Sequence, residues 1–163
     1  MSQSTVKQTV KPMIGKAKNI RVASSRKVAN VITLQEMTSG ETFSLVNRIQ
    51  AGLPFSALEE FGRAMNNSAR EVGDLLHIPP RTLVRRKEQG VLTPDESDRL
   101  VRFSRLFGAA NELFEGDVEA ARRWLQTPKR ALGNVTPLEM ARTEVGAREV
   151  EHLIGRLEHG AFS

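Results

Sequence analysis

The sequence contains no cysteine among its 163 residues. Disulfide bonds and thiolate metal sites are therefore excluded, and a reducing compartment is allowed. No apolar run approaches the ~18 residues that a membrane-spanning helix needs. No short apolar stretch with a small-residue cleavage site indicates a secretion signal. Together with a hydrophobic fraction of 39% and a charged fraction of 26%, these absences favour a soluble globular protein.

Residue patterns that carry catalysis are also missing. The sequence has no phosphate-binding loop, nucleophile elbow or pair of catalytic carboxylates. His152 and His159 lie seven residues apart, which places them two helical turns apart and too distant to share a metal ion without further ligands. His77 lies in a turn. We expect surface histidines, no metal ion, no cofactor and no catalytic residue, and hence a binding protein that is not an enzyme.

Positive charge is concentrated at the start of the chain. Residues 1–40 contain seven basic residues and one acid, Glu36, so their net charge is +6 and the remaining residues sum to −1, for a total of +5. The basic residues are Lys7, Lys11, Lys16, Lys18, Arg21, Arg26 and Lys27. A basic arm often accompanies a nucleic-acid-binding domain, but a solvated tail has the same composition. The sequence alone leaves both interpretations open.

Apolar spacing predicts helices throughout the chain after residue 40. Leu45, Val46 and Ile49 predict a helix that ends before Pro54. No strand-like alternation or internal repeat is present. The residues expected to cap later helices are Ser56, Ser68, Thr93, Asp117 and Thr136. Thr93 and Thr136 each precede a proline and have a glutamate three residues later, which is a specific signal for a helix start. The sequence therefore predicts an all-α fold.

Residues 68–89 have the dimensions of a helix-turn-helix, a motif that reads the major groove of DNA. At about 100° per residue, the second helix has a polar, basic arc, and Leu83 and Val84 are expected to face the core. The candidate DNA-binding residues are Ser68, Arg81, Thr82, Arg85, Arg86 and Gln89. Arginine can donate two hydrogen bonds to a guanine edge or bind phosphates. The alternative is an ordinary amphipathic helix with a solvated basic face.

Several short stretches follow one another in a specific order. They are Leu53-Pro54, Arg81-Thr82-Leu83, Glu96-Ser97-Asp98-Arg99-Leu100, Leu113-Phe114-Glu115-Gly116-Asp117, Trp124-Leu125, Ala131-Leu132-Gly133 and Thr136-Pro137-Leu138-Glu139-Met140. In this order the chain resembles the Xre-type antitoxins of RES–Xre toxin–antitoxin systems, which carry the Xre/MbcA/ParS toxin-binding domain. Residues 1–40 match no part of that pattern.

The resemblance implies three segments: a basic N-terminal arm (1–40), an Xre-like helix-turn-helix DNA-binding domain (41–106) and a C-terminal toxin-binding domain (107–163). It implies a cytoplasmic bacterial antitoxin that neutralises a cognate RES-domain toxin, which degrades NAD. It also implies binding to operator DNA and autoregulation of the operon. The alternative is a stand-alone helix-turn-helix transcriptional regulator. Since one helix-turn-helix covers only a half-site, we expect a homodimer within a toxin–antitoxin hetero-oligomer, with apolar positions of the long helix 94–114 as its interface.

The resemblance further implies that the extreme C-terminus approaches the toxin's active-site entrance. A helical stripe of apolar residues predicts that the last helix packs on the core almost to its end. The stripe consists of Val150, Leu153, Ile154 and Leu157. The candidate toxin-binding residues beyond or beside it are Arg156, Glu158, His159, Phe162 and Ser163. The alternative is a solvated end, as at most chain termini.

Overall fold

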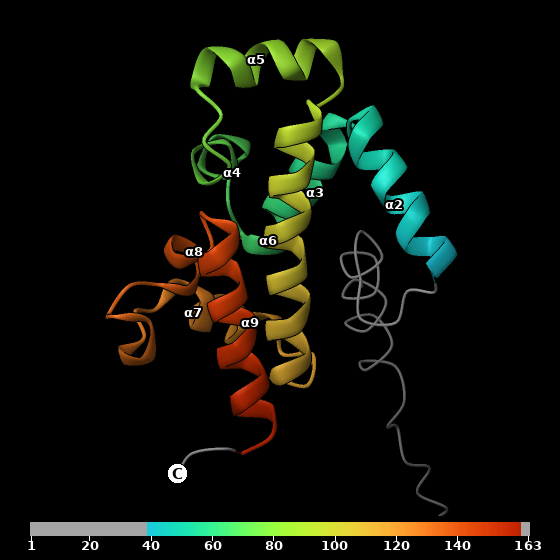
Figure 1. Cartoon of the computed structure of the whole chain (residues 1–163). Coiled ribbons are helices and arrows are strands. Elements are labelled where there is room, and N and C mark those ends of the chain that lie inside the picture. The colour runs from blue at the N-terminus through green and yellow to red at the C-terminus, as the bar shows by residue number, and fades with distance from the viewer. Residues whose placement is uncertain (1–38, 161–163) are drawn as a thin grey trace, which may run out of the picture.

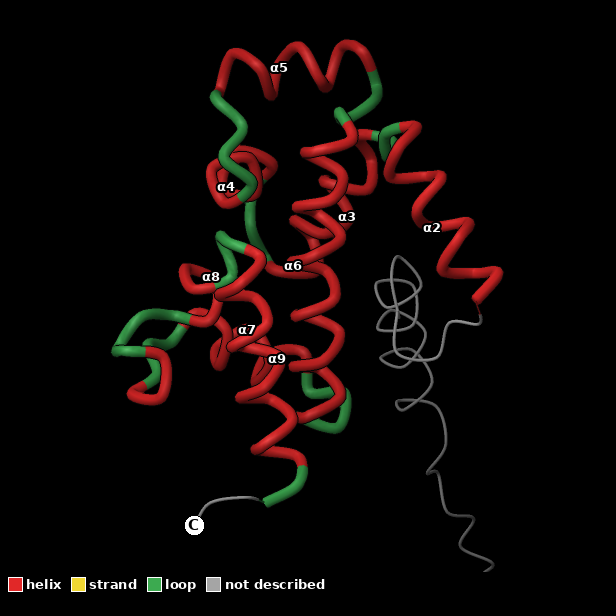
Figure 2. Tube along the Cα trace, viewed as in Figure 1, coloured by secondary structure: helices red, strands yellow, loops and turns green. Residues whose placement is uncertain are grey.

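The computed structural model describes residues 39–160, and this part of the chain is helical. Short loops join the helices, and the described residues form two isolated β-bridges but no strand (Figure 2). The helices are α2 (Ser39–Ala51), α3 (Phe55–Met65), α4 (Ala69–Leu75), α5 (Pro80–Gln89), α6 (Pro94–Leu113), α7 (Val118–Gln126), the 3-10 helix η2 (Arg130–Leu132), α8 (Pro137–Met140) and α9 (Glu144–Glu158). The predicted all-α fold is confirmed. Nearly all of the predicted basic arm lies outside the described residues.

Helix α6 is the central element and packs against α2, α7 and α9 (Figure 1). Leu100, Phe103 and Leu106 on this helix are at most 1% exposed. The apolar face of α6 is therefore covered by the chain's own core. The expectation that α6 offers an exposed apolar surface for dimerisation is wrong. None of the described helices is both long and apolar enough to cross a membrane.

Most helix starts follow the predicted capping chemistry. Side-chain caps occur as expected at Ser68, Thr93, Asp117 and Thr136. The expected cap at Ser56 is wrong, because α3 already begins at Phe55 and has no side-chain cap. The Phe55 amide donates to the Gly90 carbonyl at 2.9 Å, and the Leu92 amide donates to the Leu53 carbonyl at 2.9 Å. Backbone pairing with a distant segment thus replaces a local cap.

Helices α7 and α9 are fixed to the N-terminal half by polar contacts as well as by the core. Arg102 on α6 donates to Glu144 at 3.0 Å, and Arg105 pairs with Glu151 of α9. Arg122 on α7 donates from Nε to the Ala64 carbonyl at the end of α3, at 2.5 Å. The predicted domain boundary between residues 106 and 107 falls inside α6. One continuous helix therefore runs through both halves.

The two predicted sites lie at opposite ends of the molecule. Helix α5 lies across the upper end in Figure 1, and α9 runs beside α6 so that its C-terminal end reaches the lower end. The position of α9 requires a glycine: a Cβ atom on Gly146 would lie 1.9 Å from the Met140 carbonyl oxygen. Only glycine allows α8 and α9 to approach this closely.

Candidate functional site

The predicted helix-turn-helix is present as α4, a four-residue break and α5. In the break, His77 has φ +54°, a left-handed conformation that glycine adopts more easily. The Ile78 amide donates to the Gly73 carbonyl at 2.8 Å, and the Ile78 side chain is buried. A Cβ on Gly73 would lie 3.0 Å from Cδ2 of Leu83. The two helices therefore pack tightly, which fixes the direction of α5.

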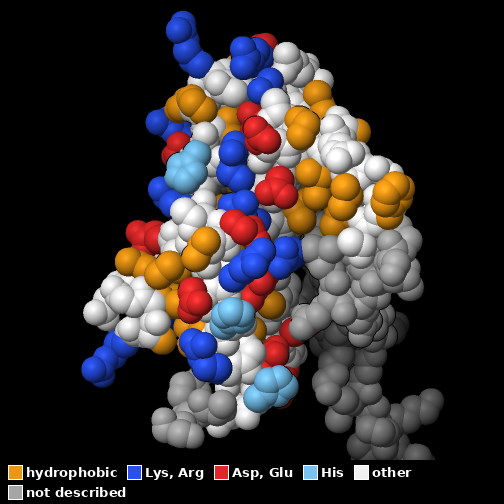
Figure 3. All heavy atoms as spheres, viewed as in Figure 1, with side chains coloured by type: hydrophobic (Ala, Val, Ile, Leu, Met, Phe, Trp, Pro, Cys, Tyr) orange, Lys and Arg blue, Asp and Glu red, His pale blue; other side chains and the backbone are white. Residues whose placement is uncertain are grey.

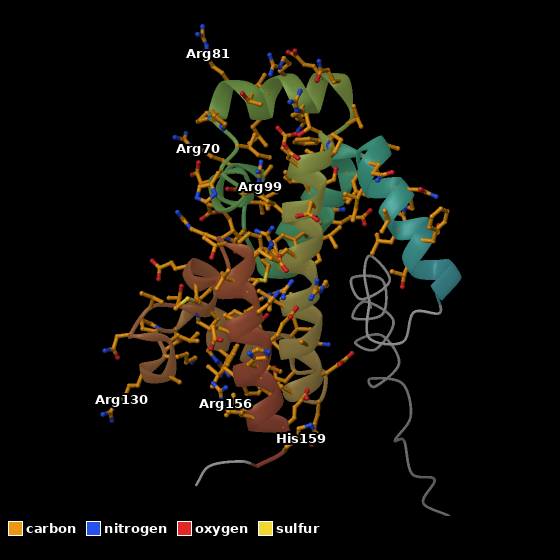
Figure 4. All side chains as sticks on the ribbon, viewed as in Figure 1. Arg70, Arg81, Arg99, Arg130, Arg156 and His159 are labelled. Carbon is orange, nitrogen blue, oxygen red and sulfur yellow. The ribbon has the colours of Figure 1, made fainter. Side chains whose placement is uncertain are left out.

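The outward face of α5 is a line of four exposed residues, here called the recognition stripe. It consists of Arg81, Val84, Arg85 and Glu88. Their spacing of i, i+3, i+4 and i+7 puts them on the side of the helix opposite the buried Leu83. Arg81 extends away from the end of the molecule (Figure 4). Within the described part of the chain, neither Arg81 nor Arg85 forms an ion pair.

The observed exposed face of α5 is rotated relative to the predicted basic arc. Arg86, expected among the outward DNA contacts, donates from Nε to Glu96 at 2.7 Å, and its side chain is only 14% exposed. Val84, expected to face the core, is 59% exposed. Both orientations were predicted wrongly. The reason is that Leu83 is the one residue of α5 buried in the core, while the ion pair with Glu96 of α6 holds Arg86 against the protein.

Glu96 provides the negative charge that holds Arg86. Burial alone would raise the pKa of Glu96, but hydrogen bonds from Arg86 and from the amide and hydroxyl of Thr93 lower the pKa below its ordinary value. The Thr93 amide donates to the same carboxylate at 2.8 Å. One carboxylate therefore caps α6 and binds α5 to it. Arg86 is a positioning residue for the recognition stripe.

The remaining predicted DNA-binding residues are partly engaged within the protein. Gln89 is exposed, but its side-chain oxygen accepts a hydrogen bond from Arg86 at 2.9 Å. The Ser68 hydroxyl donates to Glu71 at 2.7 Å in the capping box of α4. Thr82 is half-buried. Arg81 and Arg85 are therefore the two predicted DNA-binding residues with outward charges not paired within the described chain.

The sequence patterns did not indicate Arg70. It is exposed near the start of α4 and extends from the same side of the molecule as Arg81 (Figure 4). The first helix of a helix-turn-helix crosses the DNA backbone, where a cation meets phosphate groups. The feature of the sequence that could have indicated Arg70 is its position in the first turn of α4, two residues after the Ser68 cap.

At the opposite end, the predicted apolar stripe of α9 is present. Its deeply buried members are Val150, Leu153 and Ile154, which are at most 5% exposed. Leu157 is half-buried. The stripe thus holds α9 on the core as far as Ile154 and weakens over the last turn.

The predicted toxin-binding residues in the last turn are all on the surface. Arg156, Glu158 and His159 are exposed, and Figure 4 shows Arg156 and His159 at the lower end of α9. Phe162 and Ser163 lie outside the described residues. The described candidates therefore gather at one tip, which we call the α9 tip (residues 155–160).

The three histidines are exposed, as predicted: His77, His152 and His159. Residues 39–160 contain no group of three or more metal-ligating side chains that could hold a metal ion.

The fold defines a helical protein of the helix-turn-helix class with a second helical domain, and comparison with known proteins identifies its family. The antitoxin Xre-like helix-turn-helix domain matches residues 44–105. The antitoxin Xre/MbcA/ParS C-terminal toxin-binding domain matches residues 109–160.

Similar proteins support the same assignment. An antitoxin Xre from Yersinia enterocolitica is 41% identical over 120 residues, which cover 73% of this chain and 81% of the relative. An antitoxin Xre from Photorhabdus laumondii is 41% identical over 119 residues, covering 71% and 78%. A more distant relative, the Prs ADP-ribosylating antitoxin of a Sphingobium species, is 24% identical over 124 residues, covering 71% and 78%. The chain therefore belongs to the Xre antitoxin family of toxin–antitoxin systems.

Proposed function

We propose that this antitoxin neutralises a cognate RES-domain toxin, which degrades NAD, and binds operator DNA to regulate its own operon in the bacterial cytoplasm. The observation that carries the proposal is the separation of two exposed surfaces. The recognition stripe lies at one end and the α9 tip at the other. One molecule can therefore present both surfaces at once. The NAD chemistry belongs to the toxin, and this chain acts by binding.

Toxin inhibition is assigned to the α9 tip together with the residues that follow it. Leu157 is half-buried and its neighbours Arg156 and Glu158 are exposed, so the last turn contributes little to the chain's own core. A site that binds the two phosphates of NAD should accept a cation poorly as a mimic. We therefore place Arg156 against an acidic group at the rim of the entrance. Glu158, Phe162 and Ser163 are assigned to the entrance itself.

Operator binding is assigned to the recognition stripe and Arg70. Arg81 and Arg85 carry charges with no partner in the described chain, and α5 protrudes at the end of the molecule (Figure 1). A recognition helix enters the major groove with its N-terminal residues toward the bases. Two half-sites are needed for useful affinity, so we propose that a homodimer binds the operator.

The surface we assign to the dimer is on α2. Phe43 is 68% exposed and Val46 is 42% exposed, and hydrophobic side chains gather on this side of the molecule (Figure 3). A polar substitution, Phe43→Ser, tests this surface by light scattering. We expect it to shift the protein from dimer toward monomer, and an unchanged dimer would reject α2 as the interface.

The toxin assignment is tested by co-expressing this chain with the product of the neighbouring reading frame, which we expect to be a RES-domain protein. We expect the two to copurify, and the antitoxin to stop NAD consumption by the purified toxin. Absence of any complex would favour the alternative of a stand-alone transcriptional regulator. The Sphingobium relative is named an ADP-ribosylating antitoxin, so we take transfer of ADP-ribose as the second candidate chemistry. With labelled NAD, label on a protein acceptor would support transfer, and release of free products would support degradation.

A further inference from the structure

Val84 is an apolar side chain in a place where the fold does not require one. It is 59% exposed, and Leu83 already anchors α5 in the core. Valine is also a poorer helix former than alanine, because its branched side chain loses freedom in a helix. Neither core packing nor helix propensity explains its presence. Its neighbours on the recognition stripe, Arg81 and Arg85, suggest what it contacts.

We infer that Val84 reads the 5-methyl group of a thymine in the major groove of the operator. This inference rests on the proposed DNA binding. In the major groove, the thymine methyl group is the apolar feature that distinguishes an A·T pair, and apolar side chains contact it. An exposed valine between two unpaired arginines offers the matching surface: the cations draw the helix to phosphates and guanine edges, and the isopropyl group meets the methyl.

The spacing along α5 restricts where this thymine lies. Arg81 and Arg85 are four residues apart, which is about 6 Å along the helix axis. Successive bases of one strand are about 3.4 Å apart. Val84 therefore reaches a base pair within about two steps of the pairs contacted by the arginines. Glu88 lies about one turn beyond Val84 and Arg85, farther from the N-terminal end of the recognition helix. That N-terminal end is the part that meets base edges.

The test uses the full-length protein and a pool of randomised DNA duplexes. After selection, each thymine of the enriched half-site is replaced in turn by deoxyuridine, which lacks only the 5-methyl group. We expect one replacement within the half-site to weaken binding about fourfold, the value of one buried methyl-sized group. For Val84→Ala we expect the same replacement to have no effect.

Two further measurements make the test specific. Val145→Ala is a matched control, because Val145 is 76% exposed on α9, far along the chain from α5. It should keep the sensitivity of the natural protein to deoxyuridine. Restoring a methyl group at that position with 5-methylcytosine should improve binding by the natural protein relative to cytosine, but not binding by Val84→Ala.

The outcomes separate this inference from the proposed function. One outcome is enrichment of specific DNA in which no thymine-to-deoxyuridine replacement has an effect that depends on Val84. That result would overturn the role of Val84 and leave operator binding intact. Equal deoxyuridine effects in the natural protein and in Val84→Ala would do the same. Failure to enrich any DNA would overturn operator binding itself, and the reading of thymine with it. Circular dichroism of Val84→Ala checks that α5 remains helical.

Discussion

The two ends of this antitoxin that carry its proposed binding surfaces are held in different ways. At the α5 end, a short helix with a single buried anchor, Leu83, is fixed by polar contacts: Arg86 to Glu96 at 2.7 Å and the Phe55 amide to the Gly90 carbonyl at 2.9 Å. At the α9 end, an apolar stripe holds the helix as far as Ile154. Beyond that point the side chains are half-buried or exposed.

Each end therefore presents its residues in a different way. A DNA-reading helix must enter the groove in one orientation, and contacts that fix it in advance reduce the cost of ordering on binding. The α9 tip carries its candidate residues past the core, where a partner can enclose them on several sides.

Removal of residues 156–163 should abolish toxin inhibition and leave DNA binding intact. Because the buried stripe ends at Ile154, the truncated protein should remain folded, although the residues proposed to bind the toxin are gone. Removing several central interface residues typically weakens binding about a hundredfold or more. Titration of the NAD consumption that we propose for the toxin, with each antitoxin in turn, measures the effect. Removal of residues 158–163 alone, which keeps the half-buried Leu157, controls for folding, and equal inhibition by all three proteins would rule out the tip.

Arg86→Ala should destabilise the fold by about 3 kcal/mol, because it leaves the buried carboxylate of Glu96 without its cation. Urea unfolding at neutral pH measures the loss. Arg85→Ala on the same helix is the control: Arg85 is exposed, so its replacement should change stability by less than about 0.5 kcal/mol. Similar stability changes for the two variants would show that the Arg86–Glu96 pair does not anchor α5.

The same pair should give a defined acid dependence. The folded-state pKa of Glu96 is below its ordinary value of 4.5, so the unfolded state binds more protons as the pH falls. The stabilisation of the fold by the Arg86–Glu96 pair is fully present above about pH 4.5. It is lost as the pH falls through the lower folded-state pKa of Glu96. Arg86→Ala should show a shallower loss of stability in this range, measured by urea unfolding at several pH values. An identical slope for both proteins would contradict the assignment.

Arg81→Ala combined with Arg85→Ala should weaken DNA binding about tenfold or more. The salt dependence of binding should fall by about one for each phosphate that the protein no longer touches. Toxin inhibition should not change, because α5, which carries both residues, lies at the opposite end from the α9 tip (Figure 1). Arg123→Ala with Arg130→Ala removes the same charge from exposed positions in the C-terminal half and is the control. Equal affinities of the two double variants would mean that the recognition stripe is not the DNA surface.

The sequence predicted the helices well but misplaced the exposed face of α5. Capping boxes such as that of Thr93 are local, so four adjacent residues define the helix start. The orientation of α5 depends on a few contacts, and its adjacent apolar residues Leu83 and Val84 point about 100° apart. Local spacing cannot decide which of them is buried. The deciding partner of Arg86 is Glu96, on another helix, and the cap expected at Ser56 is likewise replaced by distant backbone pairing.

A small effect is expected at Gly155, which lies at the junction between the buried stripe and the α9 tip. Nothing lies within 4 Å of a Cβ placed there, whereas a Cβ on Gly146 of the same helix would meet the Met140 carbonyl oxygen at 1.9 Å. Glycine inside a helix costs up to about 1 kcal/mol relative to alanine, so Gly155→Ala should stabilise the free antitoxin by that amount in urea unfolding, and Gly146→Ala should destabilise it. Since the chain's own fold does not require glycine at position 155, we expect toxin backbone to approach there. Gly155→Ala should then bind the toxin more weakly despite its greater stability, and unchanged toxin affinity would place the toxin contacts farther toward the C-terminus.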